Sequence, residues 1–382
     1  MKRFISILFL CMILAASALA EGQVFTATQN DESAVDVSGT EQLTLSGVTV
    51  QKTDGNASSA DAASFRGVNS AVRVYGSGVL TISDSVIEAT AQNATGVFAY
   101  DHGTIYISDC DVTVTGGGAG GVQVAGGGTL IGSNLTVTSA SKAAIRSDRG
   151  GGTMMLTGGT YTSTGKNGCP AIYSTADITV KDAVCVSEQS RAVIIEGKNT
   201  VTLENVTIEG NDQSTKEGSV KANVLLYQSA SGDASMGTSV FTMTGGEMTS
   251  HSGAMFYCTN TDSVINLENA KLNLSENTLL IVSAGRWGKD GRNGGDCVLN
   301  AKDQVLEGAI IVDDISILAL HLESTAYTGA INETGEAGKV TVTLDENSTW
   351  TLTGDSYISA FEGDLSHVVM GGYQLFIDGT AI

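Results

Sequence analysis

The sequence predicts an all-β protein built as a single-stranded right-handed parallel β-helix, a solenoid with coils of about 24 residues. Two observations support this fold class. Short segments of alternating apolar and polar residues recur along the chain, and the composition of 47 Gly, one Pro and 5% aromatics favours strands and turns. Each coil has room for three short strands at about 3.3 Å per residue.

The N-terminal segment has the layout of a secretory signal peptide. Lys2 and Arg3 precede an apolar run over 4–14, and "AASALA" then offers small residues for cleavage near Ala20–Glu21. The run is too short to span a bilayer, and the mature chain contains no segment that could. We therefore expect residues 1–20 to be removed and the mature protein to be secreted, extracellular or held at the cell surface.

The β-helix is expected to fill residues 21–382, with an N-terminal cap over about 21–40. The repeat is clearest at the apolar residue before each polar turn, as in "LTLSGVTV" (43–50) and "LTISDSVI" (80–87). Counted along the chain, these residues are Leu45, Ile82, Ile107, Leu130, Leu156, Val180, Leu203, Met243 and Leu267. Polar residues at the turns, such as Asp84 and Asp109, are those that tight turns prefer.

Two long steps in the repeat predict loops. Most steps measure 23 to 26 residues, whereas steps of 37 and 40 residues contain 53–67 and 211–237. Within the second, "NVLLY" (223–227) predicts an additional strand. Beyond Leu274 the spacing loosens, so looser coils and a cap are expected over about 275–382.

Charge and cysteine content exclude some functions and leave others open. Removing Lys2 and Arg3 from the 20 Lys+Arg leaves 18 basic residues against 41 acidic ones, a net charge of −23 that excludes nucleic acid as a partner. The mature chain has five cysteines, Cys110, Cys169, Cys185, Cys258 and Cys297. Their odd number and irregular spacing favour buried thiols over a disulfide framework, with a Cys169–Cys185 bridge as the alternative.

No known catalytic set is recognisable. The Gly-His-Gly and Arg-x-Lys elements of a polygalacturonase are absent, and Pro170, the one proline, leaves no Arg-x-Pro motif for a pectate lyase. Asp101–His102 has a weak similarity to a lyase turn, but closing a coil explains it better. No serine has the nucleophile-elbow spacing, and the four histidines lack metal-ligand spacing.

Two sets of residues are candidates for binding. Counting back seven residues from each repeat marker predicts a stripe of aromatic and charged side chains, in which Gln123 and Glu196 interrupt the row. Arg146 lies close to the stripe. The candidate binding residues are Tyr75, Tyr100, Arg146, Arg149, Tyr173 and Glu196. The alternative is that these tyrosines are half-buried and the charges paired. In the loop 286–296, Asp290, Asn293 and Asp296 offer oxygen ligands for calcium, or form a solvated turn. The sequence indicates no other cofactor.

Several sequence segments resemble those of a known group of proteins. They are "SDRGGGTMMLTGGTYTSTG" (147–165), "PAIYSTADITV" (170–180), "IEGKNTVTLEN" (195–205), "LLYQSASGDAS" (225–235) and "STWTLTGDSYIS" (348–359). The chain resembles exported bacterial right-handed parallel β-helix proteins described as adhesin-like, within the pectin-lyase-like superfamily. The resemblance covers nearly all of the mature chain and implies the fold more than a function.

The sequence therefore favours a secreted or cell-surface-associated, adhesin-like, non-catalytic β-helix that binds an extracellular glycan or a surface protein. A polysaccharide lyase or glycoside hydrolase of the pectin-lyase-like superfamily is the alternative, and a structural spacer is the third hypothesis. No motif names the ligand.

Overall fold

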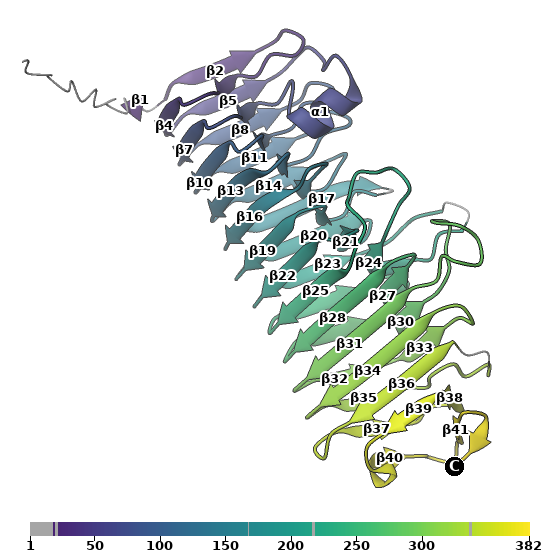
Figure 1. Cartoon of the computed structure of the whole chain (residues 1–382). Coiled ribbons are helices and arrows are strands. Elements are labelled where there is room, and N and C mark those ends of the chain that lie inside the picture. Colours follow the sequence, from purple (N-terminus) through teal and green to yellow (C-terminus); the bar gives the residue numbers. More distant parts are fainter. Residues whose placement is uncertain (1–17, 20–21, 167, 216–217, 336–337) are drawn as a thin grey trace, which may run out of the picture.

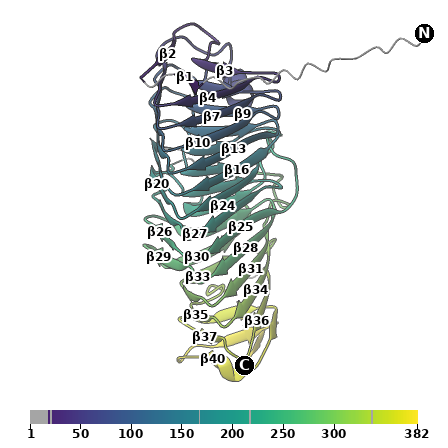
Figure 2. The same ribbon diagram turned by 90° about the vertical axis from the view of Figure 1, so that its left-hand side faces the viewer.

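Three long parallel sheets wind around one core in the computed structural model, which describes residues 18–19, 22–166, 168–215, 218–335 and 338–382. Successive strands pass from one sheet to the next and stack in parallel on the coil before, so the chain forms a right-handed parallel β-helix and the predicted fold class is confirmed. The strands lie across the long axis of an elongated stack (Figure 1), and the second view shows the same arrangement (Figure 2). Most of the segment predicted as signal peptide lies outside the described residues.

Sheet A has fourteen strands among the described residues. They are β1 (Ala18–Leu19), β4 (Gln42–Ser46), β7 (Val79–Ser83), β10 (Thr104–Ser108), β13 (Gly128–Ser133), β16 (Gly152–Thr157), β19 (Asp177–Lys181), β22 (Thr200–Glu204), β25 (Ser239–Thr244), β28 (Asp262–Glu268), β31 (Asp296–Lys302), β34 (Ile317–Glu323), β36 (Lys339–Leu344) and β39 (Ala360–Glu362).

Sheet B has ten strands in the same part of the chain. They are β2 (Val24–Ala27), β5 (Thr49–Lys52), β8 (Val86–Ala89), β11 (Asp111–Val114), β14 (Thr136–Ser139), β17 (Thr160–Lys166), β20 (Val184–Gln189), β23 (Thr207–Gly210), β26 (Glu247–Ser250) and β29 (Lys271–Leu274).

Sheet C has eleven described strands and ends each full coil. They are β3 (Val35–Val37), β6 (Val72–Val74), β9 (Val97–Tyr100), β12 (Val122–Ala125), β15 (Ile145–Ser147), β18 (Ile172–Ser174), β21 (Val193–Glu196), β24 (Ala222–Tyr227), β27 (Ala254–Thr259), β30 (Thr278–Val282) and β33 (Ala309–Val312). Strand β24 contains "NVLLY", so this segment is the regular third strand of its coil and not an additional one.

The C-terminal coils change sheets. A four-stranded sheet takes the place of sheet B, and a three-stranded sheet with one antiparallel pair, β41 with β42, closes the end. Their strands are β32 (Val305–Glu307), β35 (Ala326–Thr328), β37 (Thr349–Thr351), β40 (Val368–Val369), β38 (Ser356–Ile358), β41 (Leu375–Ile377) and β42 (Thr380–Ala381). The helix α1 (Ala60–Arg66) and the 3-10 helix η1 (Leu365–His367) complete the described elements.

The corner between sheets A and B explains the polar residues at the turns. At successive corners from Gly47 to Ser324, the last two of which lead into the four-stranded sheet, a residue adopts a left-handed backbone with φ between 49 and 68°, which glycine, asparagine and aspartate tolerate best. These residues are Gly47, Asp84, Asp109, Asn134, Gly158, Asp182, Asn205, Gly245, Asn269, Asp303 and Ser324. Side-chain amides link neighbouring corners, since Asn134 donates to Asp109 at 3.1 Å. The turn role predicted for the aspartates is confirmed.

The core is one continuous apolar ladder, and it corrects one predicted position. Ile107 pairs with Gly132, which in turn pairs with Leu156, so Gly132 and not Leu130 occupies this place in the ladder. The corner residue Leu135 is buried and supplies the missing volume, because its Cδ1 lies 3.1 Å from where a Cβ on Gly132 would stand. Because Gly132 has no apolar side chain, the sequence pattern predicts Leu130 at a position that Gly132 occupies.

The five described cysteines are free and buried, which confirms the predicted buried thiols and contradicts the alternative Cys169–Cys185 bridge. Within the described residues, no helix is long and apolar enough to cross a membrane.

Candidate binding site

The predicted stripe divides into two rows of sheet C. Gln123 pairs with Arg146, and Arg146 with Tyr173, in the row of outward side chains along the strands. Glu196 instead pairs with Tyr227 at the ends of the strands. Tyr75 and Tyr100 lie at the same strand ends, because each directly follows a residue of the paired set Val74–Ala99. Counting back from sheet A failed at Gln123 because the marker there is Gly132 and not Leu130, and at Tyr173 because the corner between the two sheets is shorter in that coil.

Part of the stripe holds α1 against sheet C. Gln123 Nε2 donates to the carbonyl of Ser64 in α1 at 2.8 Å and to Asp148 at 3.1 Å. Arg146 forms an ion pair with Asp148 at 2.8 Å, and Lys142 Nζ donates to Ser64 Oγ at 2.6 Å. Burial, followed by the neighbouring Arg146, lowers the pKa of Lys142 to about 8. These side chains therefore form contacts within the chain that hold α1 in place.

Tyr75 and Arg149 also have partners within the chain. The guanidinium of Arg73 lies 4.1 Å from the ring centroid of Tyr75. Arg149 lies 4.3 Å above the ring of Phe65 and forms an ion pair with Asp233 at 2.7 Å. Arg149 thereby connects α1 to the loop 228–238.

Tyr173 faces a hollow of about 520 Å³ on the outer face of sheet C, which we call the Tyr173–Trp287 pocket. Its lining residues are Gly168, Tyr173, Arg191, Ile194, Ser214, Thr215, Ser219, Leu225, Tyr227, Arg286 and Trp287. The volume lies within the usual range for small-molecule sites, about 300–1,000 Å³.

Sheet C and two loops build this pocket. Tyr173, Ile194 and Leu225 are successive outward residues of β18, β21 and β24, and they form its floor. The walls come from Ser214, Thr215 and Ser219 and from the loop 283–295, which projects from the same side of the stack as α1 (Figure 1). Trp287 packs against the apolar cluster under these loops, with its ring 5.1 Å from that of Tyr227 and tilted by 42°.

A buried carboxylate fixes the two tyrosines of the pocket. Glu196 is 1% exposed, and its Oε2 accepts hydrogen bonds from the hydroxyls of Tyr173 at 2.5 Å and Tyr227 at 2.8 Å. Ser229 donates to the other oxygen. Burial raises the pKa of both tyrosines, and Glu196 raises it further. Both hydroxyls therefore stay protonated and continue to donate.

Two arginines line the pocket. Arg191 forms an ion pair with Asp212 at 3.1 Å and donates to the carbonyl of Val220 at 2.6 Å. Burial lowers the pKa of Arg191; Asp212 opposes this shift, and the nearby Arg286 adds to it. The guanidinium of Arg286 lies 4.2 Å from the ring centroid of Trp287. The pocket thus combines aromatic rings, hydroxyls and guanidinium donors.

The residues predicted as calcium ligands take different places. Asp290 is exposed in the loop 283–295, whereas Asn293 is buried and its Nδ2 donates to the carbonyl of Gly285 at 2.6 Å, which holds the loop. Asp296 begins β31 and pairs in register with Asp262. Among the described residues, no group of three or more His, Cys, Asp or Glu side chains could hold a metal ion. Calcium binding stays a prediction. Asp101 and His102 both have left-handed backbones and close their coil.

Sequence analysis missed Arg191, Tyr227, Arg286 and Trp287, although Tyr173 and Glu196 were in the predicted stripe. One signal was available. Trp287 is one of two tryptophans, and it follows an arginine in the glycine-rich loop for which calcium ligands are predicted. The contact of Trp287 with Tyr227 joins residues far apart in sequence and could not be predicted from spacing.

Comparison of the chain with protein-family models, curated proteins and solved structures finds no match.

Proposed function

We propose that this protein is an exported, adhesin-like β-helix of the pectin-lyase-like superfamily that binds a glycan, without catalysis, in the Tyr173–Trp287 pocket. One observation supports this proposal most strongly. Trp287, Tyr227 and Tyr173 line a single pocket, and Arg191 and Arg286 line the same pocket.

The lining suits a saccharide. Aromatic rings offer flat apolar faces, and the apolar side of a sugar ring packs on such faces. Serine, threonine and tyrosine hydroxyls and the guanidinium groups supply the directional hydrogen bonds that sugar hydroxyls require. Ile194 and Leu225 close the floor without competing polar groups. A rigid sheet beneath these residues also limits the entropy lost on binding.

The acidic groups near the pocket support binding in preference to hydrolysis. Glycoside hydrolysis uses two carboxyl groups that flank the scissile bond. Here Glu196 accepts hydrogen bonds from hydroxyls at both of its oxygens, and Asp212 is 2% exposed and paired with Arg191. The described lining contributes arginines and hydroxyls.

The test is retention of the purified mature protein on a panel of immobilised plant, host and bacterial polysaccharides. We expect Trp287→Ala to weaken binding to a retained polysaccharide by about tenfold or more, equivalent to about 1.4 kcal/mol. Tyr106→Ala is the matched control, because Tyr106 is an exposed aromatic residue on the outer face of sheet A. Equal binding by Trp287→Ala and wild type, or no retention at all, would rule out this site.

Two further measurements test the rest of the proposal. Reducing ends or unsaturated products in the same incubations would support the alternative, a polysaccharide hydrolase or lyase. Export predicts that the protein recovered from outside the cell begins at Glu21, which N-terminal sequencing would determine.

A further inference from the structure

One of the outward rows of sheet A changes from threonine to valine partway along the stack. One outward row carries Thr104, Thr129, Thr153, Asp177 and Thr200 in successive coils. The same row then continues with Val240, Val264, Val298 and Ala319. All four of these are half-buried on the outer face. Threonine suits an exposed strand, so a run of four apolar residues in register marks a surface with a different role.

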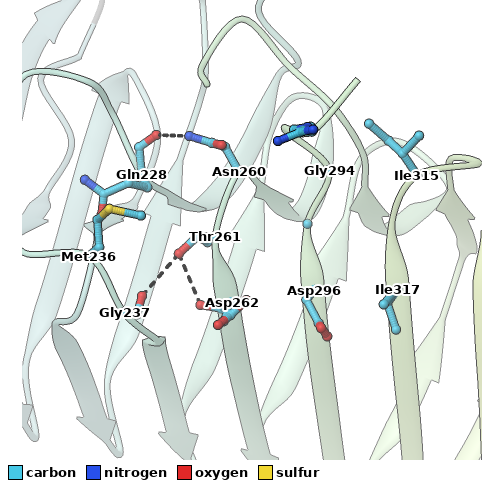
Figure 3. Close-up of a pocket in the computed structure, with 12 residues that line it drawn as sticks. Gln228, Met236, Gly237, Asn260, Thr261, Asp262, Gly294, Asp296, Ile315 and Ile317 are labelled. Atoms are coloured by element: carbon cyan, nitrogen blue, oxygen red, sulfur yellow. Dashed lines mark hydrogen bonds between the residues drawn. The ribbon is translucent and has the colours of Figure 1, made fainter. Parts of the chain in front are cut away.

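A groove runs beside this apolar row at the start of the same strands. Met236 from the loop 228–238 is 83% exposed on one side of it, and Ile315 and Ile317 are each 40% exposed on the other. Figure 3 shows Asp262 and Asp296 side by side between them, at the ends of neighbouring strands. The groove and the row are continuous, because Asp262 and Asp296 lie two residues before Val264 and Val298.

The two aspartates are available to a partner. Neither forms an ion pair within 4.0 Å among the described residues. Partial burial, followed by the charge of Asp262, raises the pKa of Asp296, and the charge of Lys339 opposes this shift.

Gln228 adds a second unsatisfied group. It lines the same groove and is 8% exposed, and its Oε1 has no hydrogen-bond partner in the described structure. Buried acceptors are rarely left without a donor. This oxygen lies against Gly197 inside the chain, so a partner in the groove would reach it only after the Gln228 side chain turned.

We propose that this surface, formed by the row Val240–Val264–Val298–Ala319 and the groove around Asp262 and Asp296, binds an extended segment of another protein that carries aliphatic side chains and a lysine or arginine. The aliphatic side chains pack on the valine row, and the cation lies between the two carboxylates. Four strands at about 4.8 Å spacing present a row of roughly 15 Å, the length of four to five extended residues.

The chemistry selects a basic polypeptide. The groove lining contains Met236, Ile315 and Ile317 and no aromatic ring among its described residues, so it lacks the flat platform of the Tyr173–Trp287 pocket. Arg292 also lines the groove, but among the described residues it forms no ion pair with either aspartate. The chain's net charge of −21 attracts a cationic segment to the surface. This interaction goes beyond the proposed glycan binding and uses a different sheet.

The test uses a fluorescent peptide of about ten residues that alternates valine and lysine, with anisotropy measured at physiological ionic strength. We expect the double variants Asp262→Asn/Asp296→Asn and Val264→Thr/Val298→Thr each to weaken binding by about tenfold or more. The controls, Asp182→Asn and Val86→Thr, change exposed residues on other parts of the stack and should bind as wild type does. Trp287→Ala should also leave peptide binding unchanged.

Several results would overturn the proposal. They are no binding of the valine–lysine peptide, equal binding of a serine–lysine peptide, which would indicate only attraction by net charge, and equal losses in the control variants. Hydrogen–deuterium exchange on the wild-type protein provides a check that needs no variant. Bound peptide should protect amides of β25, β28 and β31, and protection confined to other strands would also contradict the proposed surface.

Discussion

Gly132 and Leu135 form a complementary pair in the core, and a double-mutant cycle tests this relation. Gly132 is the position of the inward ladder at which the neighbouring coils carry Ile107 and Leu156. A Cβ added there would lie 2.8 Å from Leu156 Cδ2 and 3.1 Å from Leu135 Cδ1. Both contacts are with the tips of leucine side chains, which can move only if space exists nearby.

The magnitudes follow from these contacts. Leu135→Ala removes a fully buried leucine and should lower the free energy of unfolding by about 3 kcal/mol. Gly132→Ala alone overpacks the core by about 2 kcal/mol, partly offset by the reduced backbone entropy of alanine, so a net loss of about 1 kcal/mol is expected. In the Leu135→Ala background the new methyl group has space, and the same substitution should stabilise the protein by about 1 kcal/mol.

The cycle therefore predicts a favourable coupling of about 2 kcal/mol between the two substitutions. Equilibrium urea unfolding followed by circular dichroism measures the four free energies. Leu203→Ala, a fully buried leucine in strand β22, serves as the control and should add to Gly132→Ala without coupling. Additivity of Gly132→Ala with Leu135→Ala to within about 0.5 kcal/mol would refute the packing argument.

Three other predictions concern the core and α1. Lys142→Met should stabilise the protein by about 2 kcal/mol at pH 7. Burial lowers the pKa of Lys142 from 10.5 to about 8, so the charged lysine destabilises the folded state at pH 7, and removing it gains more free energy than the lost hydrogen bond to Ser64 costs. The free energy of unfolding of the wild type rises as the pH increases from about 8 to 10.5, because Lys142 loses its proton in the folded state first. The gain in stability from Lys142→Met should therefore largely vanish at pH 10, and an equal gain at pH 7 and pH 10 would contradict this prediction. Trp350→Ala should cost about 3–5 kcal/mol in urea unfolding, since the fully buried indole donates to the Gly329 carbonyl at 2.9 Å, and a cost below about 1 kcal/mol would be inconsistent with that packing. The native protein at pH 8 should resist alkylation of its five described cysteines, because they are buried and burial raises the pKa of Cys110 to about 11 and of Cys185 to about 12; mass spectrometry showing rapid native labelling would disprove this.

Much of the fold could be predicted from local patterns. Alternation with a period of two fixes which side chains face the core, and glycine, asparagine or aspartate marks most corners with a left-handed backbone. These signals depend on a few neighbouring residues, so they survive without knowledge of distant contacts. The exception at Leu130 arose where Gly132 removed the apolar marker and Leu135 replaced it from the corner.

The candidate sites could be predicted only in part. Tyr173 and Glu196 were recognised as members of a stripe, but their hydrogen bond depends on the register between β18 and β21. The corner between sheets C and A varies in length, and a shift of a single residue turns a side chain to the opposite face. Arg146 is a predicted member of the binding stripe, but in the structure it pairs with Asp148, which also accepts a hydrogen bond from Gln123, and Gln123 contacts α1.

The sequence alone determined that this protein is a β-helix, because strand alternation and turn chemistry are local properties repeated in every coil. Tertiary structure decided which surfaces are functional candidates. Trp287 meets Tyr227 only because the loop 283–295 folds over sheet C, and Asp262 meets Asp296 only because two coils stack in register. Both contacts join residues separated by tens of positions, and their geometry depends on the lengths of intervening loops, which composition and periodicity leave free.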